Sequence, residues 1–219
     1  FGYSKTMDKA TYQRNKDNIL KEYKFIVPCM NTDKICVFTN LGLMHQIKVL
    51  DIPAGKFRDK GVPIDNLCNY DSAKEYIIQV LDVQTMIHST LLFATAKSML
   101  KVMDGDLLNA SKRTVQATKL SEDELVAVIV ADWSEESEDK VVLQTKDGVF
   151  LKFPYAEIPK KKKSALGVRG MKLSKDDLIT NVYVMDAQNI SSIMYKEKEL
   201  EFNRLKLSKR DTKGTKVRR

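Results

Sequence analysis

One pattern recurs along the chain, and its cleanest copy runs from Val141 to Leu173. In that copy, two runs of β-branched and aromatic residues, 141–145 and 149–153, flank the tripeptide Lys146-Asp147-Gly148. An Asp-Gly pair between two such runs predicts a tight β-hairpin, because glycine accepts the positive φ angle that the turn requires. The pattern then continues with an Ile-Pro pair, four lysines and a Gly-Val pair.

The same features return at fixed spacing. The Ile-Pro and Gly-Val pairs also occur at Ile52-Pro53 and Gly61-Val62, 106 residues earlier, and Thr114-Val115 lies midway between the two copies. Each of these pairs is followed by a leucine, and the three leucines, Leu67, Leu120 and Leu173, are 53 residues apart. Self-similarity at about 50 residues is typical of stacked or radially arranged β units.

We therefore expect an all-β chain. Each unit offers about four short strands, as a propeller blade does, so the prediction is a propeller-like single domain over residues 1–219 with about five four-stranded blades. No long window keeps the apolar period of a helix. The alternative is an irregular β-sandwich with chance spacing, but three copies that share both hairpin and corner argue against it.

The pattern places the strands by residue number. The first run, Gly2 to Lys5, precedes a polar loop through Tyr12, Arg14 and Lys16. We expect the further strands at 23–27, 35–39, 43–49, 61–67, 76–81, 91–95, 100–103, 114–120, 125–130, 141–145, 149–153, 178–184, 190–195 and 200–207.

The hairpin turns differ in one unit. Gly42 and Gly148 stand where a tight turn needs positive φ. The unit between them has Ala96-Lys97-Ser98-Met99 instead of a glycine turn, so we expect its turn to be longer or differently shaped.

Composition excludes several classes of protein. No apolar run approaches the ~18 residues of a membrane span. Cys29, Cys36 and Cys68 form no C-x-x-C pair, and His45 and His88 lie far apart in the sequence, so we expect buried reduced thiols rather than a metal site, as in a cytoplasmic protein. Phe1 starts inside a strand-like run without an initiator Met, which we interpret as a fragment of a longer chain.

Charge is segregated by its position within the repeat. The chain carries a formal net charge of +8, and its cations gather in the loop before each Gly-Val strand, whereas the connection after that strand is acidic, as at Glu122-Asp123-Glu124 and Asp176-Asp177. In a radial fold one phase of the repeat lies on one rim. Cations along a curved rim suit a phosphate backbone, because each one neutralises a phosphate and releases counterions. The candidate DNA-binding residues are Arg14, Lys16, Lys56, Arg58, Lys60, Lys112, Arg113, Lys160, Lys161, Lys162, Lys163, Arg169, Lys209, Arg210, Lys213 and Lys216.

Signatures of catalysis are missing from the sequence. It contains no G-x-S-x-G and no P-loop motif, and its paired carboxylates fall in expected turns, where we interpret them as solvated. Trp133 and the tyrosines are too scattered for a platform on which bases could stack. The sequence favours binding over reaction.

The combined motifs resemble the C-terminal domain of the A subunits of bacterial type IIA topoisomerases, DNA gyrase and topoisomerase IV. The opening Gly2-Tyr3-Ser4-Lys5 is similar to the G-Y-x-K with which that domain begins, and the likeness extends over essentially the whole chain. The other matching segments are Phe38-Thr39-Asn40-Leu41-Gly42, Ile52-Pro53, Gly61-Val62, Asn66-Leu67, Thr145 to Gly148, Ile158-Pro159, Gly167-Val168 and Lys172 to Leu178.

This resemblance implies a β-pinwheel, a propeller-like disc whose blades exchange strands and whose basic rim bends double-stranded DNA largely without regard to sequence. It implies no cofactor for this part of the chain. The parent, an ATP-dependent isomerase associated with the bacterial nucleoid, would use Mg²⁺ and, through its ATPase B subunit, ATP. The DNA-cleaving tyrosine follows an arginine in the family, and this chain has no Arg-Tyr pair, so the nucleophile would lie elsewhere in the parent protein.

One departure concerns the type of enzyme. Gyrase A subunits carry a basic box, Q-R-R-G-G-K-G, in the first blade, whereas the segment from Tyr12 to Asn18 keeps Gln13-Arg14 but has no glycine. Without glycine the backbone cannot fold as tightly onto a phosphate, which favours a topoisomerase IV type. The remaining alternative function is a propeller that binds an acidic protein. A hydrolase is not favoured, because the sequence contains no set of residues that could catalyse hydrolysis.

Overall fold

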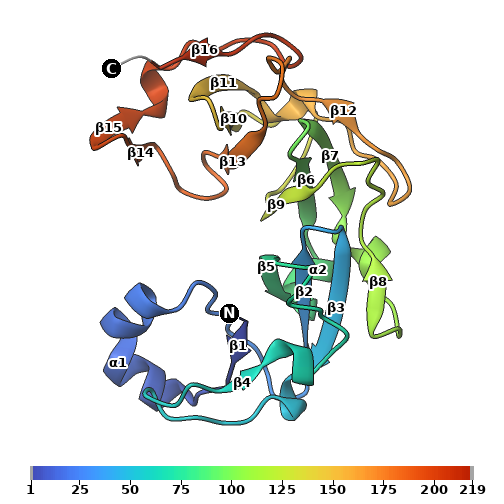
Figure 1. The fold of residues 1–219 in the computed structure, drawn as a ribbon, viewed down its shortest axis with the longest axis vertical. Coiled ribbons are helices and arrows are strands. Elements are labelled where there is room, and N and C mark those ends of the chain that lie inside the picture. The colour runs from blue at the N-terminus through green and yellow to red at the C-terminus, as the bar shows by residue number, and fades with distance from the viewer. Residues whose placement is uncertain (1, 218–219) are drawn as a thin grey trace. The chain divides into compact units, whose positions relative to one another are not determined.

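A computed structural model describes residues 2–217 of the chain, in two compact units (Figure 1). Among these residues, unit 1 comprises 2–87 and 108–117, and unit 2 comprises 88–107 and 118–217. Both are built mainly from short antiparallel strands, as the repeat predicts. The expected all-β class is confirmed. Residues 2–217 form five sheets, three with the four strands expected of a blade and two with only two strands.

Unit 1 holds one four-stranded sheet in the order β5-β2-β3-β8. Its strands are β2 (Lys34–Thr39), β3 (Leu43–Lys48), β5 (Ile77–Asp82) and β8 (Thr114–Gln116). A second sheet pairs β1 (Tyr3–Ser4) with β4 (Val62–Pro63). The core of this unit packs against the four-stranded sheet and contains Ile35, Val37, Ile47, Val49, Ile52, Ile64, Cys68 and Tyr70.

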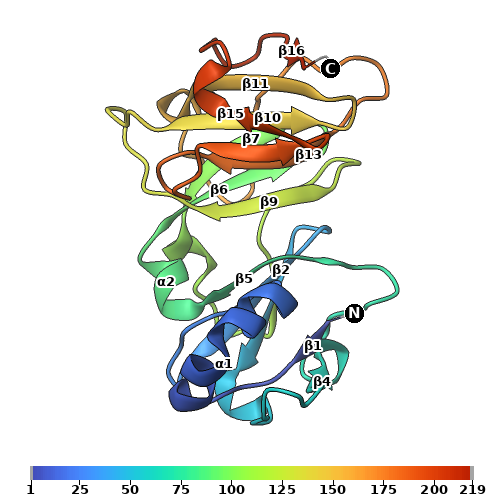
Figure 2. The same ribbon diagram turned by 90° about the vertical axis from the view of Figure 1, so that its left-hand side faces the viewer.

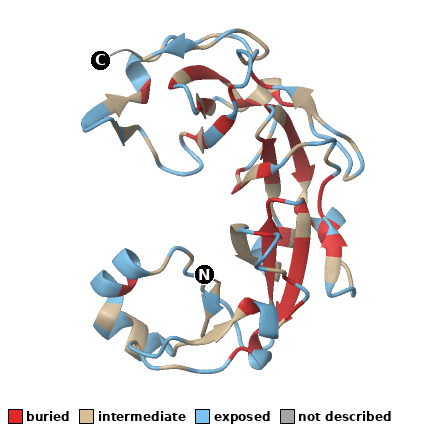
Figure 3. Ribbon diagram, in the orientation of Figure 1, coloured by how far each residue is buried: buried red, intermediate tan, exposed pale blue. Residues whose placement is uncertain are grey.

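Unit 2 holds two four-stranded sheets, in the orders β12-β7-β6-β9 and β13-β10-β11-β16, and the two-stranded sheet β14-β15. Its core lies between the two larger sheets, and Figure 3 shows the buried residues following their strands. The bounds are β6 (Thr90–Thr95), β7 (Met99–Asp104), β9 (Leu125–Val130), β10 (Lys140–Thr145), β11 (Val149–Pro154), β12 (Val168–Arg169), β13 (Ile179–Val184), β14 (Ser192–Tyr195), β15 (Lys198–Glu201) and β16 (Thr215–Lys216).

The outer strand of each four-stranded sheet comes from the next repeat. Val115 of β8 pairs with Met44, Val168 of β12 with Leu100, and Thr215 of β16 with Phe150. Val62 of β4 pairs with Ser4 in the same way. This is the strand exchange that the family resemblance implies.

The hairpin turns use positive φ even where glycine is absent. Gly42 (φ 72°) and Gly148 (φ 77°) confirm the prediction, and Ser98 adopts φ 67°. The Ser98 amide donates to the carbonyl of Thr95 at 3.0 Å, as Gly148 does to Thr145. The prediction of a longer or different turn is therefore wrong. Buried Ser98 accepts a bond from the Met171 amide at 2.8 Å through Oγ, which helps to offset the cost of a left-handed serine.

The loop expected through Arg14 and Lys16 is wrong, because this segment forms the helix α1 (Lys9–Glu22) (Figure 2). Asp8 caps the helix by accepting a hydrogen bond from the Thr11 amide at 2.8 Å. No glycine or proline interrupts residues 9–22. Only Ile19 of α1 is buried, so the sequence lacks the apolar period by which such a helix is usually detected.

Several expected strands are shorter or absent. Residues 23–27 form no strand, and Tyr23 instead donates its hydroxyl to the Phe57 carbonyl at 3.2 Å. The runs at 61–67, 114–120 and 200–207 contain only short strands, two of them followed by a tight turn. The short helix α2 (Val83–Ile87) and the 3₁₀ turns η1 (Val49–Asp51), η2 (Ile64–Asn66), η3 (Gly105–Leu108), η4 (Tyr155–Glu157) and η5 (Phe202–Arg204) complete the elements.

Candidate nucleic-acid interface

Four basic loops occupy the same place in successive repeats. Each follows a 3₁₀ turn and precedes an exchanged strand. We call them loop 1 (residues 52–61, before β4), loop 2 (109–113, before β8), loop 3 (158–167, before β12) and loop 4 (205–214, before β16). Loops 1 and 2 belong to unit 1, and loops 3 and 4 belong to unit 2.

A polar side chain on the strand that receives the exchanged partner, or directly after that strand, bonds the backbone in or next to each basic loop. In loop 3, Lys101 of β7 donates through Nζ to the carbonyls of Lys163 and Ala165, both at 2.8 Å, and lies 3.4 Å from that of Lys162. In loop 1, Lys5 donates to the carbonyls of Lys56 and Phe57 at 2.7 Å and Asp59 at 2.5 Å.

The other two regions have the same design. Gln46 of β3 donates through Nε2 to the carbonyls of Ala110 at 2.9 Å and Lys112 at 2.5 Å, both in loop 2. Lys152 of β11 donates to the Phe202 carbonyl at 2.8 Å, in the 3₁₀ turn that leads into loop 4. Sequence analysis did not identify any of these four anchoring side chains.

Solvent reaches nearly all the candidate cations. Every predicted DNA-binding residue is exposed except Lys163 and Arg210, which are half-buried. Within residues 2–217, Lys161 and Lys162 form no ion pair through their side chains. Lys160 lies 2.7 Å from Asp104 in an exposed pair. Such pairs contribute little to stability, so a phosphate could compete for this lysine.

Two further candidates, both arginines, are engaged within the protein. Arg169 pairs with Asp211 through Nη2 and Oδ2 at 3.1 Å, and this pairing raises the pKa of Arg169 and lowers the pKa of Asp211. Arg210 donates through Nη1 to the Arg169 carbonyl at 2.7 Å and through Nε to the Glu157 carbonyl at 3.0 Å. These two arginines connect loop 4 to β12 and η4, so we rank them below the lysines as phosphate ligands.

The acidic connections are partly structural rather than solvated. Asp177 is only 4% exposed, and its Oδ1 accepts bonds from the Asp147 amide at 3.1 Å and the Leu178 amide at 2.9 Å. Asp123 accepts from the Lys97 amide at 3.0 Å, in the hairpin turn of the same sheet. The expectation that these carboxylates are merely solvated is wrong for both residues, because each caps a hairpin turn.

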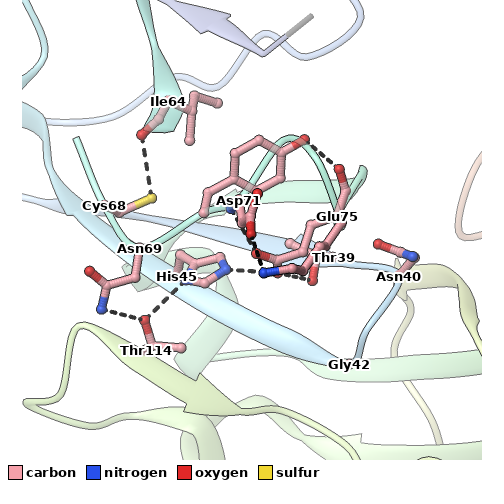
Figure 4. A network of polar contacts seen from close by, with 12 residues as sticks. Thr39, Asn40, Gly42, His45, Ile64, Cys68, Asn69, Asp71, Glu75 and Thr114 are labelled. Atoms are coloured by element: carbon pink, nitrogen blue, oxygen red, sulfur yellow. Dashed lines mark hydrogen bonds and ion pairs between the residues drawn. The ribbon is translucent and has the colours of Figure 1, made fainter. Parts of the chain in front are cut away.

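A buried polar network surrounds His45 in unit 1 (Figure 4). The imidazole lies between Glu75 Oε1, 2.9 Å from Nε2, and Thr114 Oγ1, 3.0 Å from Nδ1. Glu75 also accepts bonds from the Thr39 hydroxyl at 2.7 Å and the Asp71 amide at 2.9 Å. Burial raises the pKa of Glu75, but the hydrogen bonds from these three partners outweigh it, and the net result is a lowered pKa.

The order hydroxyl, imidazole, carboxylate is also that of a catalytic triad, but the contacts of Thr114 are those of a structural link. Thr114 begins the exchanged strand β8 and pairs with His45 across the sheet. Its Oγ1 also lies 3.4 Å from Asn69 Nδ2. The hydroxyl therefore joins the exchanged strand to β3 and to the turn before β5. We interpret the network as a structural link between repeats.

Metal and membrane sites find no support among residues 2–217. No group of three or more His, Cys, Asp or Glu side chains converges in this part of the chain, and none of its helices is long and apolar enough to cross a bilayer. Cys36 and Cys68 are buried free thiols as expected, whereas Cys29 is exposed, contrary to the prediction.

Comparison with known proteins adds a family. The family model described as DNA gyrase C-terminal domain, beta-propeller, matches residues 33–80, 89–132 and 139–184. The chain is 31% identical over 159 residues to the A subunit of DNA gyrase from Chlamydia pneumoniae, and this match covers 70% of the chain and 18% of that protein. It is 27% identical over 209 residues to the corresponding Lawsonia intracellularis protein, covering 88% of this chain and 25% of the relative.

Solved structures show the same fold. The C-terminal domain of DNA topoisomerase IV superposes with a TM-score of 0.81 at 20% identity, covering 99% of this chain and 69% of that one. The E. coli ParC C-terminal domain gives a TM-score of 0.67 at 17% identity, covering 87% of this chain and 78% of the other.

Proposed function

Because the chain belongs to the family of DNA gyrase C-terminal domains with a beta-propeller fold, we propose that it binds duplex DNA and bends it. The observation that carries this proposal is the set of four basic loops at one phase of the repeat, with exposed cations on an anchored backbone. Exposed cations contact phosphates, which fixes the position of the duplex but reads no sequence.

The rest of the enzyme would supply the chemistry. In this proposal the parent is the A subunit of an ATP-dependent type IIA topoisomerase, which cleaves DNA with a tyrosine outside this segment. Mg²⁺ would bind elsewhere in that enzyme, and ATP would bind to its B subunit. The present segment would hold a duplex near the cleavage site and influence which crossings are processed.

We further propose that the domain is closer in function to topoisomerase IV than to gyrase. The position of the glycine-rich gyrase box is taken here by α1, whose backbone donors are used within the helix, so they cannot fold around a phosphate. Arg14 and Lys16 remain exposed on this helix, but Asp17 lies beside them.

The test is duplex affinity as a function of salt. Replacement of Lys160, Lys161, Lys162 and Lys163 by alanine should weaken binding to two unrelated duplex sequences equally. The plot of log affinity against log salt should flatten by about 0.9 for each phosphate that the variant no longer neutralises. The matched control replaces four exposed lysines outside the basic loops, Lys146, Lys175, Lys196 and Lys198, with the same change of net charge.

Equal losses of affinity in the two quadruple variants would mean that only net charge matters, and would contradict a defined interface. If the chain binds an acidic protein tightly and duplex DNA not at all, the protein-interaction alternative replaces the proposal.

A further inference from the structure

We infer that Lys101 is a positioning residue for DNA binding: its buried ammonium group fixes the backbone of loop 3, and thereby the lysines that this loop presents. The inference rests on the proposed function and extends it to a residue that does not contact DNA. Lys101 is only 2% exposed and is among the largest fully buried side chains of the protein. Its three N–H groups meet the three loop carbonyls described above.

A lysine at this position is not explained by core packing. Its neighbours in β7, Leu100 and Val102, are both fully buried, and burial of an ammonium group is costly unless its donors are satisfied. Among residues 2–217 no carboxylate pairs with Lys101. Its acceptors are backbone carbonyls of loop 3, of which only that of Lys162 is also bonded to a backbone amide, from Ala165 at 3.1 Å. Residues 159–161 are held by backbone bonds to Val102 of β7, and the Lys101 bonds hold the part of the loop that follows.

The recurrence of this arrangement argues against an accident of one sheet. Lys5 and Lys101 each follow directly the residue that pairs with the exchanged valine, Ser4 with Val62 and Leu100 with Val168. Gln46 and Lys152 stand one position further along, two residues after Met44 and Phe150. Three of these side chains bond the backbone of their loop, whereas Lys152 bonds the 3₁₀ turn that leads into loop 4. The common element is hydrogen bonding to the backbone between the hairpin and the exchanged strand.

An anchored loop should bind more tightly than a mobile one. With the carbonyls held on Lys101, the exposed Lys160, Lys161 and Lys162 project from a backbone that is already ordered. A loop that is ordered before binding loses less conformational entropy when phosphates arrive. Removal of the anchor should therefore weaken binding beyond the effect of removing one charge.

The experiment compares Lys101→Met with Lys161→Met in the whole chain. Both variants lose one positive charge, but only Lys101→Met removes the anchor. Trypsin measures loop mobility directly, because loop 3 contains cleavable lysines. We expect cleavage after Lys160, Lys162 or Lys163, identified by mass spectrometry, to be about tenfold faster in Lys101→Met than in wild type, as expected when a local opening becomes easier. We expect no acceleration in Lys161→Met, and a larger loss of duplex affinity in Lys101→Met than in Lys161→Met.

Each outcome decides a point. Unchanged cleavage in a folded Lys101→Met overturns the inference. Faster cleavage with the same affinity as Lys161→Met also overturns it, but leaves the proposed function intact. If the quadruple alanine variant of loop 3 retains full affinity, loop 3 is not part of the DNA interface and both proposals for it fail. Should Lys101→Met not fold, Lys5→Met is the second variant, because Lys5 bonds the backbone of loop 1 and is only half-buried. Cleavage of loop 1 is then followed after Lys56 and Lys60, with Arg58→Met as the charge control.

Discussion

The Oγ1 atom of Thr114 lies 3.0 Å from Nδ1 of His45, so the strand contributed by one repeat is bound to a buried side chain of the repeat before it. Short exchanged strands such as β8, with three residues, have few backbone bonds of their own. The polar side chains at this junction, His45 with Glu75 and the loop anchors, compensate for the short ladder. This arrangement makes the junctions between repeats sensitive to both pH and substitution.

The first prediction concerns acid stability. The pKa of Glu75 is lowered in the folded state from its ordinary value of 4.5. Between the lowered pKa of the folded state and 4.5, the unfolded chain therefore binds more protons than the folded chain. The stability that Glu75 contributes is fully present above pH ~4.5 and is lost as the pH falls through the lower pKa of the folded state. Glu75→Gln should reduce the free energy of unfolding at pH 7, with less effect at low pH. Urea titrations of both proteins at several pH values measure this; parallel pH profiles would contradict it.

The second prediction concerns the central hairpin. Gly148 has φ 77°, and a Cβ atom there would clash with the Tyr195 hydroxyl oxygen. Gly148→Val should destabilise the chain by at least ~1 kcal/mol from backbone strain alone. Because the nearby atom belongs to a side chain, Gly148→Ala combined with Tyr195→Phe should recover part of the loss and leave the strain. Thermal unfolding of Gly148→Ala, Tyr195→Phe and the double variant separates the side-chain clash from the backbone strain. If the double variant is no more stable than Gly148→Ala, the whole loss comes from the backbone.

The third prediction concerns the protonation of Lys101. Burial lowers its pKa to about 8, from an ordinary value of 10.5. Between these values the unfolded chain binds more protons than the folded chain, so the contribution of this group to the free energy of unfolding rises with pH from about 8 to 10.5. Deprotonation also leaves two N–H donors for three carbonyls. Side-chain NMR should show one lysine titrating near pH 8, and Lys101→Met should remove that signal; a titration near 10.5 would contradict the prediction.

The sequence predicts the elements that depend on neighbours in the chain. The hairpins β2-β3 and β10-β11 connect adjacent runs through glycine turns, so local pattern was sufficient. The exchanged strands join residues far apart, as in the pairing of Val168 with Leu100, and only the family resemblance indicated them. The helix α1 was missed because it buries a single side chain, and Ser98 was misjudged because the bond that supports its turn comes from Met171, 73 positions along the chain.

The candidate site divides in the same way. The candidate cations could be identified because lysines cluster in the sequence, whereas the anchors are single polar or charged residues without a distinguishing pattern. A signal was present: Lys101 and Lys152 interrupt apolar runs at Leu100–Met103 and Phe150–Phe153, where both faces of the strand are buried. The partners of Arg169 and Arg210, in contrast, lie on remote segments, and nothing in the sequence indicates that they are engaged.

The last prediction concerns how the domain handles DNA. Bending a duplex of 20 to 30 base pairs by 40 to 90° costs about 1 to 6 kcal/mol, so a full wrap requires strong binding along the whole path. In the segment that corresponds to the gyrase box, α1 offers Arg14 and Lys16 with Asp17 beside them and no glycine. The densest cations lie instead in loops 3 and 4. We therefore expect the domain to bend duplex DNA over an arc without trapping a stable, handed wrap. When closed circular DNA is relaxed by a nicking-closing enzyme with the domain bound, the DNA product should carry few additional supercoils. DNA relaxed in the presence of the loop 3 quadruple variant should carry fewer still. Strong positive writhe for each bound domain would contradict the topoisomerase IV-like function and identify the domain as a gyrase-type wrapping element.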